Sequence, residues 1–257
     1  MRKPILAGNW KMHKTAAQGK ALVEKIEDPA SSITEVEKVV CPSFLAIPDV
    51  ARTLVDTDIG VGAQDMHWKE SGAYTGEISP LMLQEFCTYV IIGHSERREY
   101  FDETDETVNR KVKAAFGHEL TPIVCVGETQ ELRESGRTEP WIKDQVTKAL
   151  NGLTGEQVAR LILAYEPIWA IGTGLAATAE QAEAVCGPVI RATIKELYDQ
   201  DTAEAVRIQY GGSIKPHNAE ELMSQPNIDG GLVGGASLQS EDFVEIIRLT
   251  AKAKGLL

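Results

Sequence analysis

The sequence predicts an α/β fold, a single (βα)8 barrel of eight parallel strands that occupies residues 1–257. Two observations predict it. Short apolar runs recur along the whole chain, and most are continuous rather than alternating, which is typical of parallel strands that are covered on both faces. Stretches with helical spacing separate these runs, and repeated βαβ units close into a barrel through right-handed crossovers.

The strands are expected at eight places: Ile5–Asn9, Lys38–Cys41, Ile59–Ala63, Tyr89–Gly93, Pro122–Val126, Leu161–Tyr165, Val206–Tyr210 and Gly231–Val233. An open doubly wound sheet is the alternative fold, but no GxGxxG motif follows the first strand. Since no Pro/Ser-rich linker or change in composition divides the chain, we assign it to one domain.

Helices are marked most clearly at three places: Ala16–Ile26, Thr178 to about Tyr198, and a helix opened by Ser240 over Phe243–Ala253. Thr178 precedes Gln181 by three residues, which is the spacing of a capping box at a helix start. The segment Ser95–Arg98, directly after the fourth strand, fits a first helical turn.

Charge and cysteine content exclude several classes of partner. With 26 Lys+Arg against 38 Asp+Glu, the formal net charge is −12, which argues against nucleic acid and membrane surfaces, because both need clustered cations. The four cysteines form no CxxC pair and the histidines no metal-binding spacing, so we expect reduced thiols, no metal and a cytoplasmic location. The apolar run after Met1 is too short for a signal peptide, and no run approaches the ~18 residues of a membrane span.

Polar residues and glycines gather where the expected strands end. They form five groups: Asn9-Trp10-Lys11, Gly93-His94-Ser95-Glu96-Arg97, Glu166-Pro167, Gly211-Gly212-Ser213 and Gly234-Gly235-Ala236-Ser237. The amino ends of the strands show nothing comparable. Because the active sites of such barrels lie at the carboxyl ends of the strands, we expect the site on this rim.

Glu166 is the candidate general base, with a simple strand cap as the alternative role. It directly follows an apolar run, and Pro167 restrains the backbone after it. The apolar loop Ile168–Gly174 contains two glycines and can be buried only by closing over something. A carboxylate beneath such a lid loses water, which raises its basicity.

His94 is the candidate electrophile. It leads into an expected helix, and a helix N-terminus disfavours protonation, so we expect a neutral imidazole that donates a hydrogen bond. Lys11 and Asn9 are candidate site residues because they lie on the same rim. Taken singly, the alternatives are a structural histidine, a surface lysine and a turn asparagine.

The paired glycines after the seventh and eighth strands are the candidates for phosphate binding. Backbone N–H groups of tight turns in these loops form the recurring phosphate site of such barrels. Two ordinary left-handed turns are the alternative.

Over essentially its full length the sequence resembles the triosephosphate isomerase family, in its bacterial form. The matching segments are Gly8–Met12, Gly72–Glu77, Gly93–Arg98, Ala164–Gly174, Tyr210–Ser213 and Gly234–Ser237. The resemblance implies a TIM barrel that interconverts dihydroxyacetone phosphate and D-glyceraldehyde 3-phosphate, a step of glycolysis and gluconeogenesis, without a metal or an organic cofactor.

The resemblance also implies the role of each catalytic residue, taken over from the family. Glu166 moves a proton between two carbons through an enediolate, His94 polarises the carbonyl, and Lys11 with Asn9 holds the developing negative charge. The substrate-binding residues that it implies are Asn9, Trp10, Lys11, Gly172, Ser213, Gly234 and Gly235.

A lid and a dimer contact are implied as well. The residues expected to form or support the lid and the catalytic side chains are Ser95, Glu96, Pro167, Ile171, Gly174 and Tyr210. The family is usually homodimeric, and the loop around Thr75 then reaches the partner's Asn9 and the partner's Lys11. The chain departs from the family at Asp65, where Asn is common, at Ser43, where a second Pro is usual, and in the unplaced stretch Met66–Glu70.

Two other functions remain open from the residues alone. A Schiff-base aldolase or another phosphate-binding barrel enzyme is one alternative, and the aldolase would need a desolvated lysine, for which Lys11 is the only candidate. A non-catalytic barrel is the other, although such a chain would not need to keep all four catalytic candidates.

Overall fold

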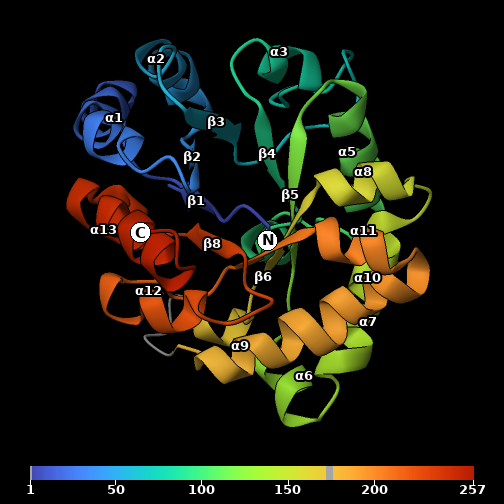
Figure 1. Cartoon of the computed structure of the whole chain (residues 1–257). Helices are drawn as coiled ribbons and strands as arrows, with labels where there is room; N and C mark the ends of the chain where they lie inside the picture. Colours follow the sequence, from blue (N-terminus) through green and yellow to red (C-terminus); the bar gives the residue numbers. More distant parts are fainter. Residues whose placement is uncertain (1, 172–175) are drawn as a thin grey trace.

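The closed barrel predicted from the sequence is confirmed. A computed structural model describes residues 2–171 and 176–257, and its strands pair in parallel in the order β1-β2-β3-β4-β5-β6-β7-β8. Helices surround these strands (Figure 1). The strands are β1 Ile5–Asn9, β2 Glu37–Cys41, β3 Ile59–Ala63, β4 Tyr89–Ile92, β5 Thr121–Val126, β6 Ile162–Tyr165, β7 Arg207–Tyr210 and β8 Gly230–Val233.

The bounds of β1 and β3 match the prediction, and each other strand differs from it by one residue at one end. The early end of β4 has a clear cause. Gly93 follows it with φ +77°, a left-handed conformation that leaves the strand and that glycine adopts without steric cost.

The α-helices are α1 Ala16–Ser31, α2 Ile47–Thr53, α3 Pro80–Gln84, α4 Ser95–Tyr100, α5 Asp105–Gly117, α6 Gln130–Glu134, α7 Thr138–Leu150, α8 Gly155–Arg160, α9 Ala179–Val185, α10 Ala192–Leu197, α11 Gln200–Ala205, α12 Pro216–Met223 and α13 Ser240–Ala253. The capping box of Thr178 and Gln181 opens α9. From α9 the helix continues through the π-helical segment Cys186–Arg191 into α10, and α1 runs past its predicted end at Ile26.

Strand side chains alternate between the inside and the outside of the barrel. Ile5 and Ala7 pack with Ile162 and Ala164 in an inner cluster made of strand residues, whereas Leu6 packs in the layer between strands and helices. Because this alternation has a period of two, the inward register of β1 and β6 continues to Asn9 and to residue 166 at the carboxyl end. The alternation that fills the barrel interior therefore also directs the side chain of the candidate base, Glu166, toward the interior at the carboxyl end of the barrel.

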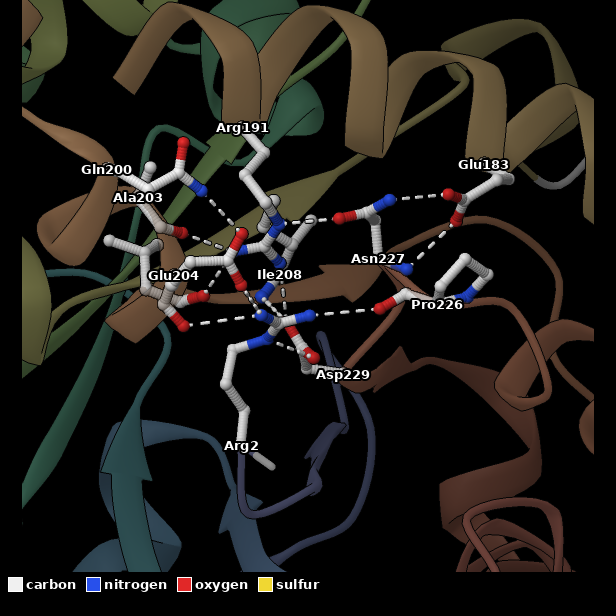
Figure 2. Close-up of polar contacts among 11 residues, drawn as sticks. Arg2, Glu183, Arg191, Gln200, Ala203, Glu204, Ile208, Pro226, Asn227 and Asp229 are labelled. Atoms are coloured by element: carbon white, nitrogen blue, oxygen red, sulfur yellow. Dashed lines mark hydrogen bonds and ion pairs between the residues drawn. The ribbon is translucent and has the colours of Figure 1, made fainter. Parts of the chain in front are cut away.

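The amino ends of the strands carry a polar network, so the prediction that they show nothing comparable is wrong. Arg191 donates a 2.9 Å hydrogen bond to Asp229 Oδ2, and Arg2 Nε lies 2.7 Å from Asp229 Oδ1. Figure 2 shows how Asn227 links Arg191 to Glu183 in the same network. These groups pair with one another, which is the arrangement of a structural network.

Within the described residues, none of the helices combines the length and the apolar character needed to cross a membrane.

Candidate active site

A cavity of about 550 Å³ lies at the carboxyl end of the barrel. It collects residues from the ends of strands that are far apart in the sequence. The predicted site residues that line it are Asn9, Trp10, Lys11, His94, Ile171, Ser213, Gly234 and Gly235. The structure thus brings most of the predicted rim residues around one space.

Lys11 enters this cavity from an unusual backbone conformation. Its φ is +51°, a region that is unfavourable for a residue with a Cβ. Its N–H donates to Asn9 Oδ1 over 3.0 Å, and Gln64 Nε2 donates to its carbonyl over 2.9 Å. Asn9 and Gln64 therefore hold the backbone of Lys11, and Gln64 is a residue that the sequence analysis missed.

Glu96 pairs with the Lys11 side chain. Lys11 Nζ lies 2.5 Å from Glu96 Oε1, so the ammonium has a carboxylate partner from the first turn of α4. A lysine paired in this way is the opposite of the unpaired, desolvated amine that Schiff-base chemistry requires.

Trp10 has mainly a packing role in this structure. Its side chain is fully buried, and a Cβ on Gly19 of α1 would lie 3.2 Å from its ring. It also lines the cavity, so its predicted contact with substrate stays a prediction.

His94 is the N-cap residue of α4, and its ring is oriented by the helix that it caps. The N–H of Glu96 donates to Nδ1 over 3.2 Å. Because Nδ1 accepts, the proton of the neutral ring must reside on Nε2. Nε2 lies 2.9 Å from Glu166 Oε1, so the only donor of the neutral imidazole points toward the candidate base.

Glu166 is buried, with 1% of its surface exposed. Its Oε2 accepts a 2.9 Å hydrogen bond from the N–H of Ser95. Two glycines make room for it: a Cβ on Gly127 would lie 2.0 Å from the Glu166 carbonyl oxygen, and one on Gly211 3.0 Å from its Cγ. Gly127 was not predicted from the sequence, because only the pairing of β5 with β6 brings it to this position.

The pKa values of Glu166 and His94 shift in opposite directions because the two groups face each other. Burial raises the pKa of Glu166, but the His94 imidazole and the Ser95 amide lower it more, so its pKa lies below the ordinary value. Burial lowers the pKa of His94, but the Glu166 carboxylate and Glu96 raise it more. The predicted rise in the basicity of Glu166 is wrong for this arrangement, and the pKa of His94 shifts in the opposite direction to the one expected at a helix N-terminus, since each residue stabilises the charged form of the other.

The base of the predicted lid is fixed by a fully buried carboxylate. Glu128 Oε1 accepts hydrogen bonds from Tyr165 Oη and Trp169 Nε1, both over 3.0 Å. The Arg133 guanidinium lies 4.5 Å from the centre of the Trp169 ring. Glu128 was not predicted from the sequence, although it follows β5 and so lies on the same rim.

Tyr210 and Pro167 meet at a further glycine. A Cβ on Gly212 would lie 2.2 Å from Tyr210 Oη and 3.0 Å from Pro167 Cγ, so no side chain fits there. Burial raises the pKa of Tyr210 to about 12, while the backbone amide of Ala177 opposes the rise. The Tyr210 phenol thus faces the segment that follows the lid. The predicted lid residues Gly172 and Gly174 lie outside the described residues.

The two glycine turns border the cavity on the side of β7 and β8. Gly235 begins the 3-10 helix Gly235–Leu238, so the N-terminal turn of that helix lines the cavity. A Cβ on Gly234 would lie 3.7 Å from Lys11 Cε. Helix N-termini and glycine turns present N–H groups to anions, and a lysine stands beside this one.

Thr75 is exposed and is not among the described residues that line the cavity. Aromatic rings pack beside its loop: the His67 ring is stacked on Trp68 with ring centres 4.1 Å apart and is tilted against Tyr74 with ring centres 4.4 Å apart. In the part of the chain that the structure describes, no group of three or more His, Cys, Asp or Glu side chains could hold a metal ion.

Comparisons with known proteins agree on one family. The family model described as triosephosphate isomerase matches residues 4–250. A triosephosphate isomerase from Clostridium perfringens (strain SM101 / Type A) is 55% identical over 248 residues, which cover 96% of this chain and 99% of that protein. One from Caldanaerobacter subterraneus subsp. tengcongensis is 54% identical over the same shares of the two chains.

Proposed function

The chain belongs to the triosephosphate isomerase family and is an isomerase, and from that premise we propose that it interconverts dihydroxyacetone phosphate and D-glyceraldehyde 3-phosphate through an enediolate. The observation that carries this proposal is the 2.9 Å distance between Glu166 Oε1 and His94 Nε2, beside a cavity that His94 and Lys11 line. A carboxylate, a ring N–H and a cation in one small space are what a proton transfer next to a carbonyl requires.

Glu166 is the proposed base. Its carboxylate takes a proton from the carbon next to the substrate carbonyl, and the electron pair of the broken C–H bond forms the double bond of the enediolate. The carbonyl oxygen gains the negative charge and then takes the proton of the neighbouring hydroxyl group by way of His94. As that second oxygen becomes the new carbonyl, the electron pair of the double bond takes the proton from Glu166 at the former carbonyl carbon. The lowered pKa of Glu166 keeps the carboxylate ionised in the unliganded protein. Once substrate lies between Glu166 and His94, burial raises the pKa of Glu166 and so makes it a stronger base.

His94 and Lys11 are the proposed stabilisers of that negative charge. The Nε2–H of His94 donates to the substrate oxygens, and the ammonium of Lys11 acts on the same charge at short range. When substrate separates Glu166 from His94, the carboxylate that raises the pKa of the imidazole is removed, and burial then favours the neutral ring.

The phosphate is proposed to bind at Ser213, Gly234 and Gly235, with Gly172 as a further contact. Neutral N–H groups and one lysine are sufficient for a dianion, so the net charge of −12 does not oppose an anionic substrate. Closure of Pro167–Gly174, latched by Tyr210, would exclude water and keep the enediolate from eliminating phosphate.

We also infer a cytoplasmic homodimer. Exposed apolar side chains follow β1 and β2 and occur on α3, with Met12 95%, Leu45 88% and Met82 57% exposed. Gln64, which follows β3, donates hydrogen bonds to the carbonyls of Lys11 and Cys41, so the segments after β1 and β2 are neighbours. Apolar side chains on adjacent loops are typical of a protein interface, and a partner's Thr75 loop would then cover Lys11.

The test is an isomerase assay of the purified protein with D-glyceraldehyde 3-phosphate. Glu166→Asp draws the carboxylate back by one methylene, and a misplacement of about 1 Å costs about 10²-fold in kcat. Lys11→Ala should lose at least as much, whereas Lys20→Ala, an exposed lysine on α1, should behave as the wild type. An inactive wild-type protein, or equal rates in all four proteins, would refute the proposal.

A further inference from the structure

The peptide groups of Gly127 are held by two side chains of α7. Its N–H donates to Gln145 Oε1 and its carbonyl accepts from Trp141 Nε1, both over 2.9 Å. Trp141 and Gln145 are four residues apart, so they lie on the same face of the helix. Gly127 is the first residue after β5, where the strand ladder no longer supplies partners for its backbone.

Gln145 is a buried polar side chain on the core face of its helix. It is 4% exposed and stands beside Ile142, Val146 and Ala149, which are completely buried. A buried amide in such surroundings is costly unless its hydrogen bonds are made. The carbonyl oxygen of Gln145 accepts the hydrogen bond from the Gly127 N–H, which ties the side chain to the end of β5.

Gly127 is in turn the surface against which the candidate base packs. A Cβ at Gly127 would lie 3.1 Å from Glu166 Cβ and far inside contact distance of its carbonyl oxygen. The segment around Gly127 also receives the backbone of the next strand, because the N–H of Glu166 donates to Val126 O over 2.8 Å and that of Ile168 to Glu128 O over 3.2 Å. A shift of the Gly127 peptide would therefore move Glu166 and the first residues of the lid together.

We propose that Gln145 and Trp141 are positioning residues, which act through Gly127 to set the place of the Glu166 carboxylate against His94. The proposal rests on the base role of Glu166 given above. Neither side chain is among the described residues that line the cavity, so both act from outside it. Their contribution is to kcat rather than to substrate binding.

The first variant is Gln145→Met, which keeps the length of the side chain and removes the acceptor. We expect kcat to fall about 10- to 100-fold, as expected for a misplaced base, with KM within about twofold of the wild type. Gln145→Glu keeps an acceptor for the Gly127 N–H but buries a charge. It should retain most of kcat while unfolding more easily.

Val146→Ala is the matched control for stability, since it removes buried atoms from the same helix without touching Gly127. If kcat follows stability across the three variants, or if Gln145→Met keeps the kcat of the wild type, the proposal is overturned. Should Gln145→Met fail to fold, Trp141→Phe decides: a fall in kcat of about threefold or more supports positioning, and an unchanged kcat refutes it.

A crystal structure of Gln145→Met, or of Trp141→Phe if that variant decides, separates this proposal from the proposed function. Glu166 Oε1 should move away from its 2.9 Å contact with His94 Nε2, and an unmoved carboxylate would overturn positioning. This readout does not depend on turnover. If the wild type fails the isomerase assay, the proposed function falls while the displacement still tests the role of Gln145.

Discussion

Lys11 Nζ lies 2.5 Å from Glu96 Oε1, which joins the segment after β1 to the first turn of α4. The side chains are 28% and 38% exposed, so water screens the pair and its contribution to stability is small. Glu96 also donates its N–H to His94 Nδ1. One residue thus contacts two proposed catalytic groups, the ammonium through its carboxylate and the imidazole through its backbone.

Glu96→Gln tests the first of these contacts. The amide keeps the size of the side chain and leaves the backbone bond to His94 intact, but it removes the counter-charge that holds Lys11. We expect kcat/KM for glyceraldehyde 3-phosphate to fall about 10- to 100-fold through misplacement of the ammonium. The free energy of unfolding should change by less than about 1 kcal/mol.

Glu99→Gln is the matched control, because it removes an exposed carboxylate from the same helix. Its kinetics should equal those of the wild type. Equal kinetics for Glu96→Gln as well would show that Lys11 needs no partner from α4.

The facing of His94 and Glu166 predicts a change in the titration of the imidazole. In the wild type the Glu166 carboxylate raises the pKa of His94 above 6.5 despite burial. In Glu166→Gln that charge is absent, and burial outweighs the remaining rise from Glu96, so the pKa of His94 should fall relative to the wild type. Because folding raises the pKa of His94 in the wild type, the protonated ring stabilises the folded protein. This contribution to the free energy of unfolding is complete below pH 6.5 and is lost as pH rises through the folded pKa.

NMR of the unliganded protein, with ¹⁵N-labelled histidine, measures this titration. A His94 resonance that titrates at the same pH in wild type and Glu166→Gln would mean that the carboxylate does not act on the ring.

Thr75→Arg tests the proposed homodimer. A bulky charge on the loop that would reach the partner should be left unpaired in an interface, which is costly. At micromolar concentration the wild type should sediment at twice the 28.0 kDa chain mass, and the variant at the single mass with strongly reduced activity. Val55→Arg places the same charge at an exposed apolar residue before β3, 74% exposed, and should leave mass and activity unchanged. A fully active wild-type monomer would contradict the interface.

The strands and the rim were predictable because both depend on local patterns. Continuous apolar runs identify buried parallel strands, and parallel strands place their carboxyl ends together, so Asn9, Lys11, His94 and Glu166 had to share one rim. The helix start at Thr178 was predictable for the same reason, since a capping box is a feature of four residues.

The contacts that hold the site were not predictable, because they join residues distant in sequence. Gln145 reaches Gly127 across 18 positions, and Gln64 reaches Lys11 across 53. Nothing local distinguishes these glutamines from solvated ones. The predicted pKa shifts of Glu166 and His94 had the wrong direction for a related reason. The pKa of each residue depends on the other residue, and their contact appears only when β4 and β6 are placed.

Asp65 stands in a buried ion network in which the carboxylate is costly. Its two oxygens lie 2.6 Å from Lys111 Nζ and 2.9 Å from Arg97 Nε, and Glu103 shares both cations. Burial raises the pKa of Asp65 to about 6, with Lys111 and Arg97 opposing and Glu103 adding to the rise. The folded chain therefore binds this proton more tightly than the unfolded chain does.

Asp65→Asn should for that reason stabilise the protein at high pH and not at low pH. An acid whose pKa is raised by folding contributes its full stability below its unfolded pKa of 3.8, and loses it as pH rises through about 6. Because asparagine carries no charge to desolvate, we expect it to exceed the wild type by about 1–3 kcal/mol at pH 8. The difference should vanish near pH 4. Urea unfolding at both pH values and at one protein concentration measures it, with exposed Asp56→Asn as the control. A loss of stability at pH 8 would mean that the pairs with Lys111 and Arg97 outweigh the cost of burying the carboxylate.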